Sequence, residues 1–236
     1  MASTGSGGQP AAVSPDPLAA ASSFRIDRSS TAERVADVLR ELITRGDLPA
    51  GTALREQQLV SSLDVSRNTL REAFRLLTHE RLLLHEPYRG VSVRVLSADD
   101  VSDLYRVRKV VECGIVADPP DLTGLHSVEL AVREGERAFD DADWQALGTA
   151  NIHFHQALVA LAGSARLDDL MRGILAELRL VFHVMADPRR FHEPYLTRNR
   201  EIAGLLVQAE FAAATTALRR YLDDAEQQLV QAYSAG

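Results

Sequence analysis

The sequence predicts a mainly α-helical fold in which a small β-hairpin near residue 90 separates an N-terminal helical segment from a C-terminal antiparallel helical bundle. Two observations support this prediction. Apolar residues recur every three or four positions along most of the chain, and no Val- or Ile-rich alternating run follows Val95. The chain has 236 residues, 46% of them hydrophobic and 25% charged, which is typical of a protein that buries a core.

The composition excludes several classes of protein. A single cysteine, Cys113, rules out an internal disulfide framework and a cysteine-only metal cluster. No apolar run approaches 18 residues, so we expect no transmembrane helix and no membrane partner. Residues 1–24 are rich in Ala, Ser, Gly and Pro but have neither a basic start nor an apolar core. They predict a disordered tail rather than a secretory signal, and hence a cytoplasmic protein.

The formal net charge of −7 conceals two different units. Residues 25–96 carry a net charge of +2, whereas residues 97–236 carry −8. The acidity of the whole chain argues against a nucleic-acid partner, but the count by segment removes that objection for the first unit. We therefore divide the chain into a tail (1–24), a mildly basic domain (25–96) and an acidic helical domain (97–236).

The first domain begins with three predicted helices. A Ser-x-x-Glu capping box at residues 30–33 starts the first helix, and Gly46 ends it. A short helix is expected over 55–63, followed by a tight turn at 64–65 and a third helix that Ser66 caps and that runs to about residue 79. The expected apolar stripe of the first helix consists of Val35, Val38, Leu39, Leu42 and Ile43.

A hairpin completes this domain. Residues 82–84 and 91–95 are expected to form two strands joined by a turn at 87–90. The order helix, helix, turn, helix, hairpin is that of a winged helix-turn-helix, which places its third helix in a DNA groove. This domain therefore contains the only strands that the sequence predicts, in an otherwise helical chain.

Three arginines share one face of the third helix. Arg67, Arg71 and Arg75 are spaced at i, i+4 and i+8, and such a face at a helix N-terminus meets phosphates or guanine edges in a major groove. The spacing alone is more typical of a solvated helix face, and only the surrounding turn, cap and hairpin favour DNA binding. Arg75 is the weakest candidate, because Glu72 and Glu80 are near enough to engage it.

The second domain is expected to be a bundle of about six helices. Ser97 caps the first of them, and Pro and Gly residues separate several of the others. An exposed basic loop containing Arg189, Arg190 and His192 is expected between Asp187 and Pro194. The expected helices cover residues 98–117, 123–139, 142–162, 165–186, 194–208 and 210–233.

The first domain resembles the GntR family of bacterial transcription regulators. The residues that carry the resemblance are Leu-Arg-Glu-Gln-Gln-Leu at 54–59, Val-Ser-Arg-Asn-Thr-Leu-Arg-Glu-Ala at 65–73, Leu-Leu at 76–77 and Arg-Gly-Val at 89–91. The resemblance implies a homodimer that binds a short palindrome in double-stranded DNA. The DNA contacts that it implies are Gln57, Ser66, Arg67, Asn68, Thr69, Arg71, Arg89 and Gly90.

The second domain resembles the FadR subfamily of these regulators, whose C-terminal FCD-type bundle binds a small effector and dimerises. The matching residues are Leu104, Tyr105, Arg108, Glu112, Phe154, His155, Leu158, Arg200 and Ile202. Many members hold a divalent metal there with one Asp and three His. At the aligned positions this sequence has Asn151, His155, Asn199 and Tyr221. One imidazole with neutral Asn and Tyr is a poor donor set for Zn or Ni, so we expect no metal and no cofactor.

A polar pocket is expected in place of the metal. Asn151, His155, Asn199 and Tyr221 would supply hydrogen bonds, and Arg108 would supply positive charge for an acidic group of the effector. Arg108 is equally well placed to pair with Glu112 at i+4 as a helix staple. A metal-free pocket leaves two alternatives, a larger organic ligand such as an acyl thioester or no effector at all.

The sequence thus predicts a bacterial DNA-binding transcription regulator, a repressor, whose operator binding responds to a small molecule. The alternative is a constitutive DNA-binding dimer whose bundle only dimerises. We do not expect an enzyme, because the chain contains no HExxH, nucleophile-elbow, Walker or GxGxxG motif.

Overall fold

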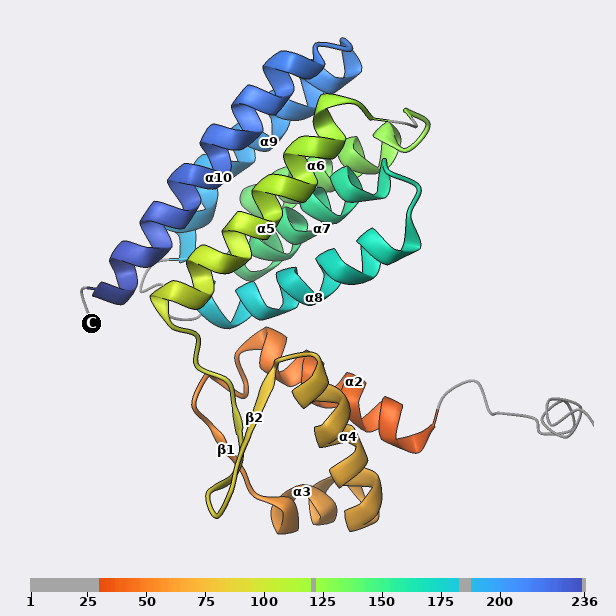
Figure 1. Ribbon diagram of the computed structural model, residues 1–236, viewed down its shortest axis with the longest axis vertical. Coiled ribbons are helices and arrows are strands. Elements are labelled where there is room, and N and C mark those ends of the chain that lie inside the picture. Colours follow the sequence, from red (N-terminus) through yellow and green to blue (C-terminus); the bar gives the residue numbers. More distant parts are fainter. Residues whose placement is uncertain (1–29, 120–121, 183–187, 235–236) are drawn as a thin grey trace, which may run out of the picture.

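The computed structural model describes residues 30–119, 122–182 and 188–234 and arranges them as a small N-terminal unit beneath a larger helical bundle (Figure 1). This arrangement confirms the mainly α fold class, with its only sheet among the described residues in the N-terminal unit. The predicted tail over 1–24 and the end of the helix predicted to reach residue 186 lie outside the described residues.

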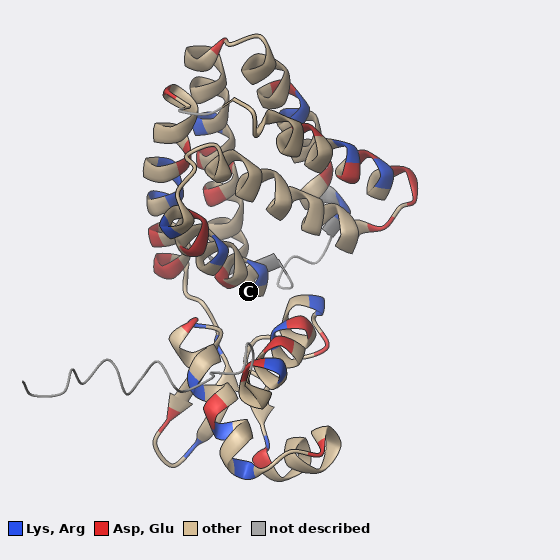
Figure 2. Cartoon of the chain, turned by 90° about the vertical axis from the view of Figure 1, so that its right-hand side faces the viewer, with Lys and Arg blue, Asp and Glu red and all other residues tan. Residues whose placement is uncertain are grey.

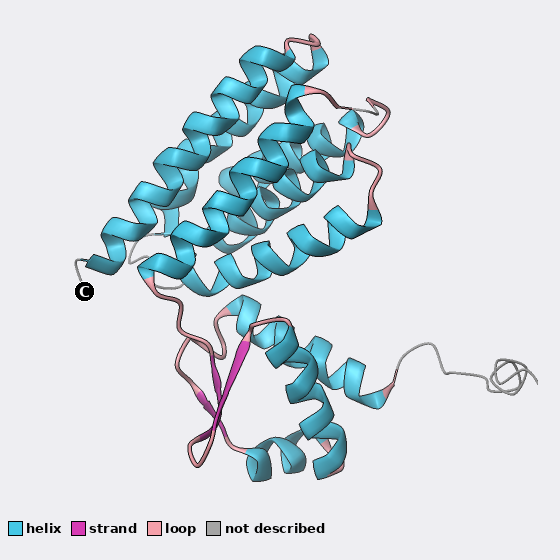
Figure 3. Ribbon diagram, in the orientation of Figure 1, coloured by secondary structure: helices cyan, strands magenta, loops and turns pink. Residues whose placement is uncertain are grey.

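The N-terminal unit contains three helices and a three-stranded antiparallel sheet (Figure 3). Strand β3 is central and pairs with both other strands, with Ser92 opposite Ala53 and Val93 opposite Leu83. The first strand was not predicted, because its two residues become a strand only through pairing with β3. The elements are α2 (Thr31–Arg45), β1 (Ala53–Leu54), α3 (Glu56–Leu63), α4 (Arg67–His79), β2 (Leu83–Glu86) and β3 (Gly90–Val93).

The predicted caps of α2 and α4 are confirmed. The Ser30 hydroxyl accepts a hydrogen bond from the Glu33 amide at 3.1 Å, and the Ser30 amide donates to the Glu33 carboxylate at 2.6 Å. The turn before α4 has Asp64 in the left-handed region, with φ of 50°, and Ser66 then accepts from the Thr69 amide at 3.1 Å. These caps orient α4 on the core of the unit.

The core of the N-terminal unit lies between α2, α4 and the sheet. Leu39 and Leu70 are fully buried in it, but Val38, which the sequence placed on the apolar stripe, is 46% exposed. The prediction for Val38 is wrong because the face of α2 that packs on the core is narrower than the set of apolar residues spaced three or four positions apart. Leu180 comes from the bundle and is also part of this core.

The C-terminal unit is a bundle of six helices among the described residues, as predicted. Its core surrounds the fully buried side chains of Tyr105, Phe154 and Tyr221. The closest packing joins α6 to α7 and α5 to α10. The helices are α5 (Ala98–Ala117), α6 (Leu125–Asp140), α7 (Trp144–Ala160), α8 (Ala165–Phe182), α9 (Pro188–Val207) and α10 (Phe211–Ser234).

Helix α9 begins at Pro188, so two predictions were wrong: that the helix starts at about residue 194, and that an exposed basic loop lies between Asp187 and Pro194. Proline is tolerated at the first helical position, but Pro194 lies inside the helix and lacks the N–H for an intrahelical bond. Burial of Phe191, His192 and Tyr195 against the bundle, each at most 5% exposed, outweighs that loss. Tertiary packing thus overrides the local break signal.

The two units meet along α8, which lies beside α2 at the lower face of the bundle (Figure 1). Arg94, after β3, pairs with Glu177 of α8 at 3.1 Å and with Asp100 of α5 at 2.7 Å. Basic and acidic positions are interspersed in both units (Figure 2). Nowhere in the described chain is a helix both long enough and apolar enough to cross a membrane.

Candidate DNA interface and effector site

The predicted DNA contacts lie on α3, on the first turn of α4 and at the hairpin tip. Figure 1 shows these three segments at the end of the N-terminal unit that faces away from the bundle. Thr69 is half-buried, and the others are exposed. The exposed residues are Gln57, Ser66, Arg67, Asn68, Arg71, Arg89 and Gly90.

The N-terminus of α4 has a fixed first turn with no acidic residue in it. The Ser66 hydroxyl lies 3.1 Å from the Thr69 amide and 2.8 Å from the Thr69 hydroxyl, which fixes the first turn. First-turn N–H groups have no partner within a helix, and the helix dipole favours negative charge at this end. Arg67 is exposed here, and no ion pair with another described residue engages its guanidinium.

The two other arginines of this face are engaged. The Arg71 guanidinium contacts both carboxylate oxygens of Glu56 on α3, at 3.0–3.3 Å. Arg75 pairs with Glu72 at 3.0 Å. Exposed pairs of this kind contribute about 0–1 kcal/mol, so a DNA phosphate can compete for either arginine. Glu80 pairs with Arg40 instead, at 2.7 Å.

The hairpin tip presents Arg89 beside Glu86, with 3.6 Å between their charged atoms. Gly90 has φ of +89°, which an L side chain rarely adopts, and a Cβ there would meet no atom within 4 Å. Glycine is therefore favoured at this position by the backbone conformation and not by a lack of room for a side chain. A hollow of about 420 Å³ separates the hairpin from α4, lined by Glu56, Arg71, Phe74, Arg75, Thr78, His85 and Val91.

The five predicted effector residues converge from four helices into one hydrogen-bonded network. Asn151 and His155 come from α7, and Arg108, Asn199 and Tyr221 come from α5, α9 and α10. The Asn199 amide donates to Asn151 Oδ1 at 2.8 Å. The Tyr221 hydroxyl lies 2.8 Å from the same oxygen and 3.1 Å from His155 Nε2. Because that hydroxyl has one hydrogen, it donates to one of these acceptors at a time.

Glu112 completes the network; the sequence analysis named it among the residues that match the FadR subfamily, but gave it no role beyond that of the partner of Arg108 in a helix staple. Its carboxylate accepts from Arg108 Nε at 2.7 Å and contacts His155 Nδ1 at 2.6 Å, with both Arg108 and Glu112 buried. The staple and the pocket therefore coexist. His153, two residues before His155 on α7, is exposed instead and contacts Glu134 at 2.8 Å.

Burial and charge set the protonation of Glu112 and His155. Burial alone would raise the pKa of Glu112, but Arg108 and His155 hold that pKa below its ordinary value. Burial lowers the pKa of His155 in spite of the Glu112 carboxylate. At neutral pH, Glu112 is therefore ionised and His155 is neutral, with its proton on the Nδ1 that faces Glu112. The charges of Arg108 and Glu112 cancel.

A small cavity of about 10 Å³ lies beside the network. This is about the space of one water molecule. Two buried polar atoms of the network, Arg108 Nη2 and Asn199 Oδ1, have no hydrogen-bond partner within the described part of the chain. The cavity is lined by Tyr105, Arg108, Asn151, Ile152, His155, Leu175, Phe191, Tyr195, Tyr221 and Ala225.

The residues here do not fit the metal that the resemblance implies. Both nitrogens of the only imidazole in the network, His155, face hydrogen-bonding partners, and its neighbours Asn151, Asn199 and Tyr221 are neutral. Among the described residues, no group of three or more His, Cys, Asp or Glu could hold a metal ion. An imidazole held in this way is not free to coordinate one.

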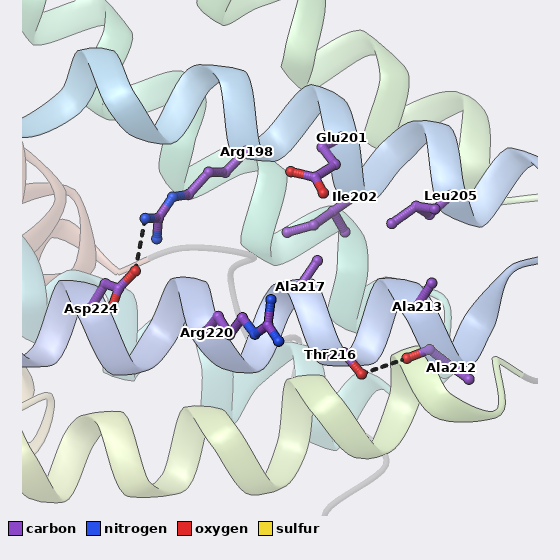
Figure 4. A pocket seen from close by; sticks show the side chains of 10 residues that line it. All are labelled: Arg198, Glu201, Ile202, Leu205, Ala212, Ala213, Thr216, Ala217, Arg220 and Asp224. Atoms are coloured by element: carbon purple, nitrogen blue, oxygen red, sulfur yellow. Dashed lines mark hydrogen bonds and ion pairs between the residues drawn. The ribbon is translucent and has the colours of Figure 1, made fainter.

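An open groove of about 630 Å³ lies between α9 and α10 of the bundle (Figure 4). Arg198 crosses one end of it to pair with Asp224 at 2.7 Å, and Thr216 turns its hydroxyl back to the Ala212 carbonyl. None of the predicted effector residues lines this groove. It is separate from the buried network.

Comparisons with known proteins place the chain in a family. The model of the bacterial regulatory proteins, gntR family, matches residues 31–93, and that of the FCD domain matches residues 103–224. A crystal structure of a transcriptional regulator named GntR, from Rhodococcus sp. RHA1, is 48% identical and has a TM-score of 0.83. The match covers 87% of this chain and 100% of that one.

Two curated relatives agree with this placement. An uncharacterized HTH-type transcriptional regulator in an unstable DNA locus of Streptomyces ambofaciens is 30% identical over 78% of each chain. The gluconate operon transcriptional repressor of Bacillus licheniformis is 30% identical over 57% of this chain and 56% of its own length. The chain belongs to the GntR family of transcription regulators and carries an FCD effector-binding domain.

Family membership fixes the general roles of the two units. The N-terminal unit is a DNA-binding helix-turn-helix domain, and the helical unit is a small-molecule effector domain. The family is one of transcription regulators rather than enzymes.

Proposed function

We propose that this protein is a cytoplasmic, homodimeric repressor of the FadR subfamily, without catalytic activity, that binds a palindromic operator. Its DNA-binding domain is residues 25–96, its effector-binding and dimerisation domain is residues 97–236, and residues 1–24 are a tail. The relatives that share the family include a protein named as an operon repressor, which supports repression. In this proposal α4 enters the major groove and the hairpin lies beside it.

Each predicted DNA contact has a place in this proposal. Arg67 and Arg71 read base edges or phosphates from α4, and Arg89 and Gly90 approach the backbone at the hairpin tip. Gln57, Ser66, Asn68 and Thr69 supply hydrogen bonds around the helix N-terminus. The position of these segments at one end of the domain supports this assignment.

We propose further that the effector binds at the network of Arg108, Asn151, His155, Asn199 and Tyr221, with no metal. The observation that carries this proposal is the pair of unpartnered buried atoms, Arg108 Nη2 and Asn199 Oδ1, since buried polar groups are nearly always hydrogen-bonded. An occupant of the cavity that accepts from Arg108 Nη2 would satisfy that group. One that also reaches Asn199, which does not itself line the cavity, and donates to its Oδ1 would satisfy both. Because Glu112 already neutralises Arg108, an uncharged polar group suits this site better than an acidic one.

A thermal-shift screen tests the effector proposal. A specific ligand that binds the native protein raises the melting temperature by mass action, by an amount that grows with ligand concentration. We expect a small polar compound to do so in the wild type and to change operator affinity. The same compound should fail with Asn199→Leu, while Gln156→Leu on α7, outside the network, should behave as the wild type. A ligand whose shift survives Asn199→Leu would place the effector elsewhere.

One observation favours the constitutive dimer as a second candidate. The cavity beside the network holds only about one water molecule, so the bundle as it stands has no space there for an effector. If no compound in the screen raises the melting temperature while operator binding is tight, the bundle serves only to dimerise. Light scattering at the 25.8 kDa monomer mass or twice that mass tests the dimer itself.

A further inference from the structure

Arg179 joins the two units through a single buried guanidinium. It comes from α8, is 6% exposed, and donates from Nε to the Thr44 carbonyl at 3.2 Å and from Nη2 to the Thr149 hydroxyl at 2.7 Å. Thr44 lies in the last turn of α2, in the DNA-binding unit, and Thr149 lies in α7. One side chain therefore holds a helix end of one unit to a helix of the other.

The C-terminal end of α2 has carbonyl groups that need hydrogen-bond donors from outside the helix. The last carbonyls of a helix have no intrahelical partner, and a cation is favourable at this end of the helix dipole. Gln145 of α7 donates to the neighbouring Arg45 carbonyl at 3.4 Å, so the bundle supplies donors to two consecutive carbonyls. Helix α2 in turn packs on the DNA-reading helix α4. This contact, together with the Arg94–Glu177 pair and the packing of Leu180, holds α2 and the α4 packed on it against the bundle.

The same guanidinium lies close to helices that carry the polar network. Thr149 lies two residues before Asn151 on α7, so the two side chains point to different faces of that helix and are joined only by its backbone. On the neighbouring helix α9, His192 approaches α7 so closely that a Cβ on Gly148 would lie 2.9 Å from its Nε2. Burial and the charge of Arg179 lower the pKa of His192 to about 4, which reflects how near the two groups are.

Residues in the wall of the cavity link the polar network to the surroundings of Arg179. Phe191 and Tyr195 of α9 line the cavity, and His192 lies between them in the sequence. Because the cavity holds about one water molecule, a larger occupant has to displace these side chains. Displacement of α9 shifts His192, which is packed against Gly148 and lies near Arg179.

We propose that Arg179 is the positioning residue that transmits the state of the polar network to the DNA-binding unit, through Thr149 and His192 on one side and the Thr44 carbonyl on the other. The proposal rests on the proposed function, since it describes how that network regulates DNA binding. Such coupling requires that the polar network and the DNA-binding unit both favour the same arrangement of α8 relative to α2.

A double-mutant cycle on the full chain tests the coupling without a ligand. Tyr221→Phe perturbs the network by removing one hydroxyl, and Arg179→Gln removes the relay. The readouts are amide hydrogen exchange in the last turn of α2 and affinity for a DNA site selected by the wild type. Thr149→Val is a second relay variant that keeps the charge of Arg179, so the cycle can be completed if Arg179→Gln does not fold. Arg172→Gln, at an exposed arginine of the same helix, is the matched control.

We expect Tyr221→Phe to change α2 exchange and operator affinity at least about threefold in the wild-type and Arg172→Gln backgrounds. With either relay variant, the same substitution should change neither by more than the error of the measurement. Equal responses in all backgrounds, or no response to Tyr221→Phe in the wild type, would overturn the relay. An effector that still changes operator affinity in Arg179→Gln would overturn the relay and leave the proposed effector function standing. A ligand screen with no hit, together with intact coupling in the mutant cycle, would overturn the effector proposal and leave the relay standing.

Discussion

Replacement of Arg108 by Met should destabilise the protein severely, because it leaves a buried carboxylate without its cation. The side chains of Arg108 and Glu112 are 3% and 0% exposed, and the guanidinium is 2.7 Å from the carboxylate. Removing one partner of a buried ion pair costs about 3–5 kcal/mol. The loss should be partly offset by proton uptake, since the pKa of Glu112 would rise without Arg108.

The double variant Arg108→Met with Glu112→Gln separates charge from packing. The side-chain amide that Glu112→Gln introduces would keep an acceptor for His155 Nδ1 while removing the unpaired charge. The double variant should therefore be more stable than Arg108→Met alone by at least about 2 kcal/mol. Urea unfolding at fixed protomer concentration measures the free energy of unfolding. Arg106→Met removes a 73% exposed arginine that pairs with Asp103, and should cost at most about 1 kcal/mol.

Two results would contradict a stabilising role for the Arg108–Glu112 ion pair. A cost below about 1 kcal/mol for Arg108→Met would mean that Glu112 does not depend on Arg108 in the folded state. A double variant as unstable as the sum of the two single variants would mean that their effects come from packing rather than from paired charge.

Three further predictions follow from the structure. Arg67→Ala should weaken binding to a selected operator by about 1–3 kcal/mol if Arg67 reads a base, and a uniform loss on all sequences with a smaller salt slope would assign it to phosphate. The pKa of His192 is lowered to about 4 from the ordinary value of about 6.5, so the unfolded state takes up its proton first and stability is lost as the pH falls from about 6.5 to 4. Urea unfolding at pH 7 and pH 5 should show a smaller loss for His192→Gln, and an unchanged loss would contradict the assignment. Gly148→Ala should cost about 1–3 kcal/mol because its Cβ meets His192 at 2.9 Å, whereas Gly173→Ala, with no atom within 4 Å, should be neutral or stabilising in thermal melts.

Local signals in the sequence were sufficient for the elements that position α4. The capping box at residues 30–33 and the Ser66 cap depend on side chains within three positions, so their pattern predicts their geometry. Strand β1 and the start of α9 depend instead on distant partners. A two-residue strand exists only beside β3, and burial of Phe191 and Tyr195 continues a helix through Pro194.

The same distinction applies to the candidate site. Alignment with the family brought Asn151, Asn199 and Tyr221 together around His155, and the structure places all four in one network. The central role of Glu112 was missed because its i+4 spacing to Arg108 already explained it as a helix staple. Leu180 was missed as part of the DNA-binding core because apolar periodicity shows that a face is buried but not which unit covers it.

Selection of bound sequences from a random DNA pool tests the role of α4 in DNA binding most directly. The selected site is then titrated with the wild type, with Arg67→Ala and with the control Arg219→Ala on the bundle. We expect the wild type to select a palindrome with two half-sites and Arg67→Ala to lose about 1–3 kcal/mol on it, while Arg219→Ala binds as the wild type. Selection of no common sequence, or equal affinity of Arg67→Ala and the wild type over a range of salt concentrations, would contradict the placement of α4 as the DNA-reading helix.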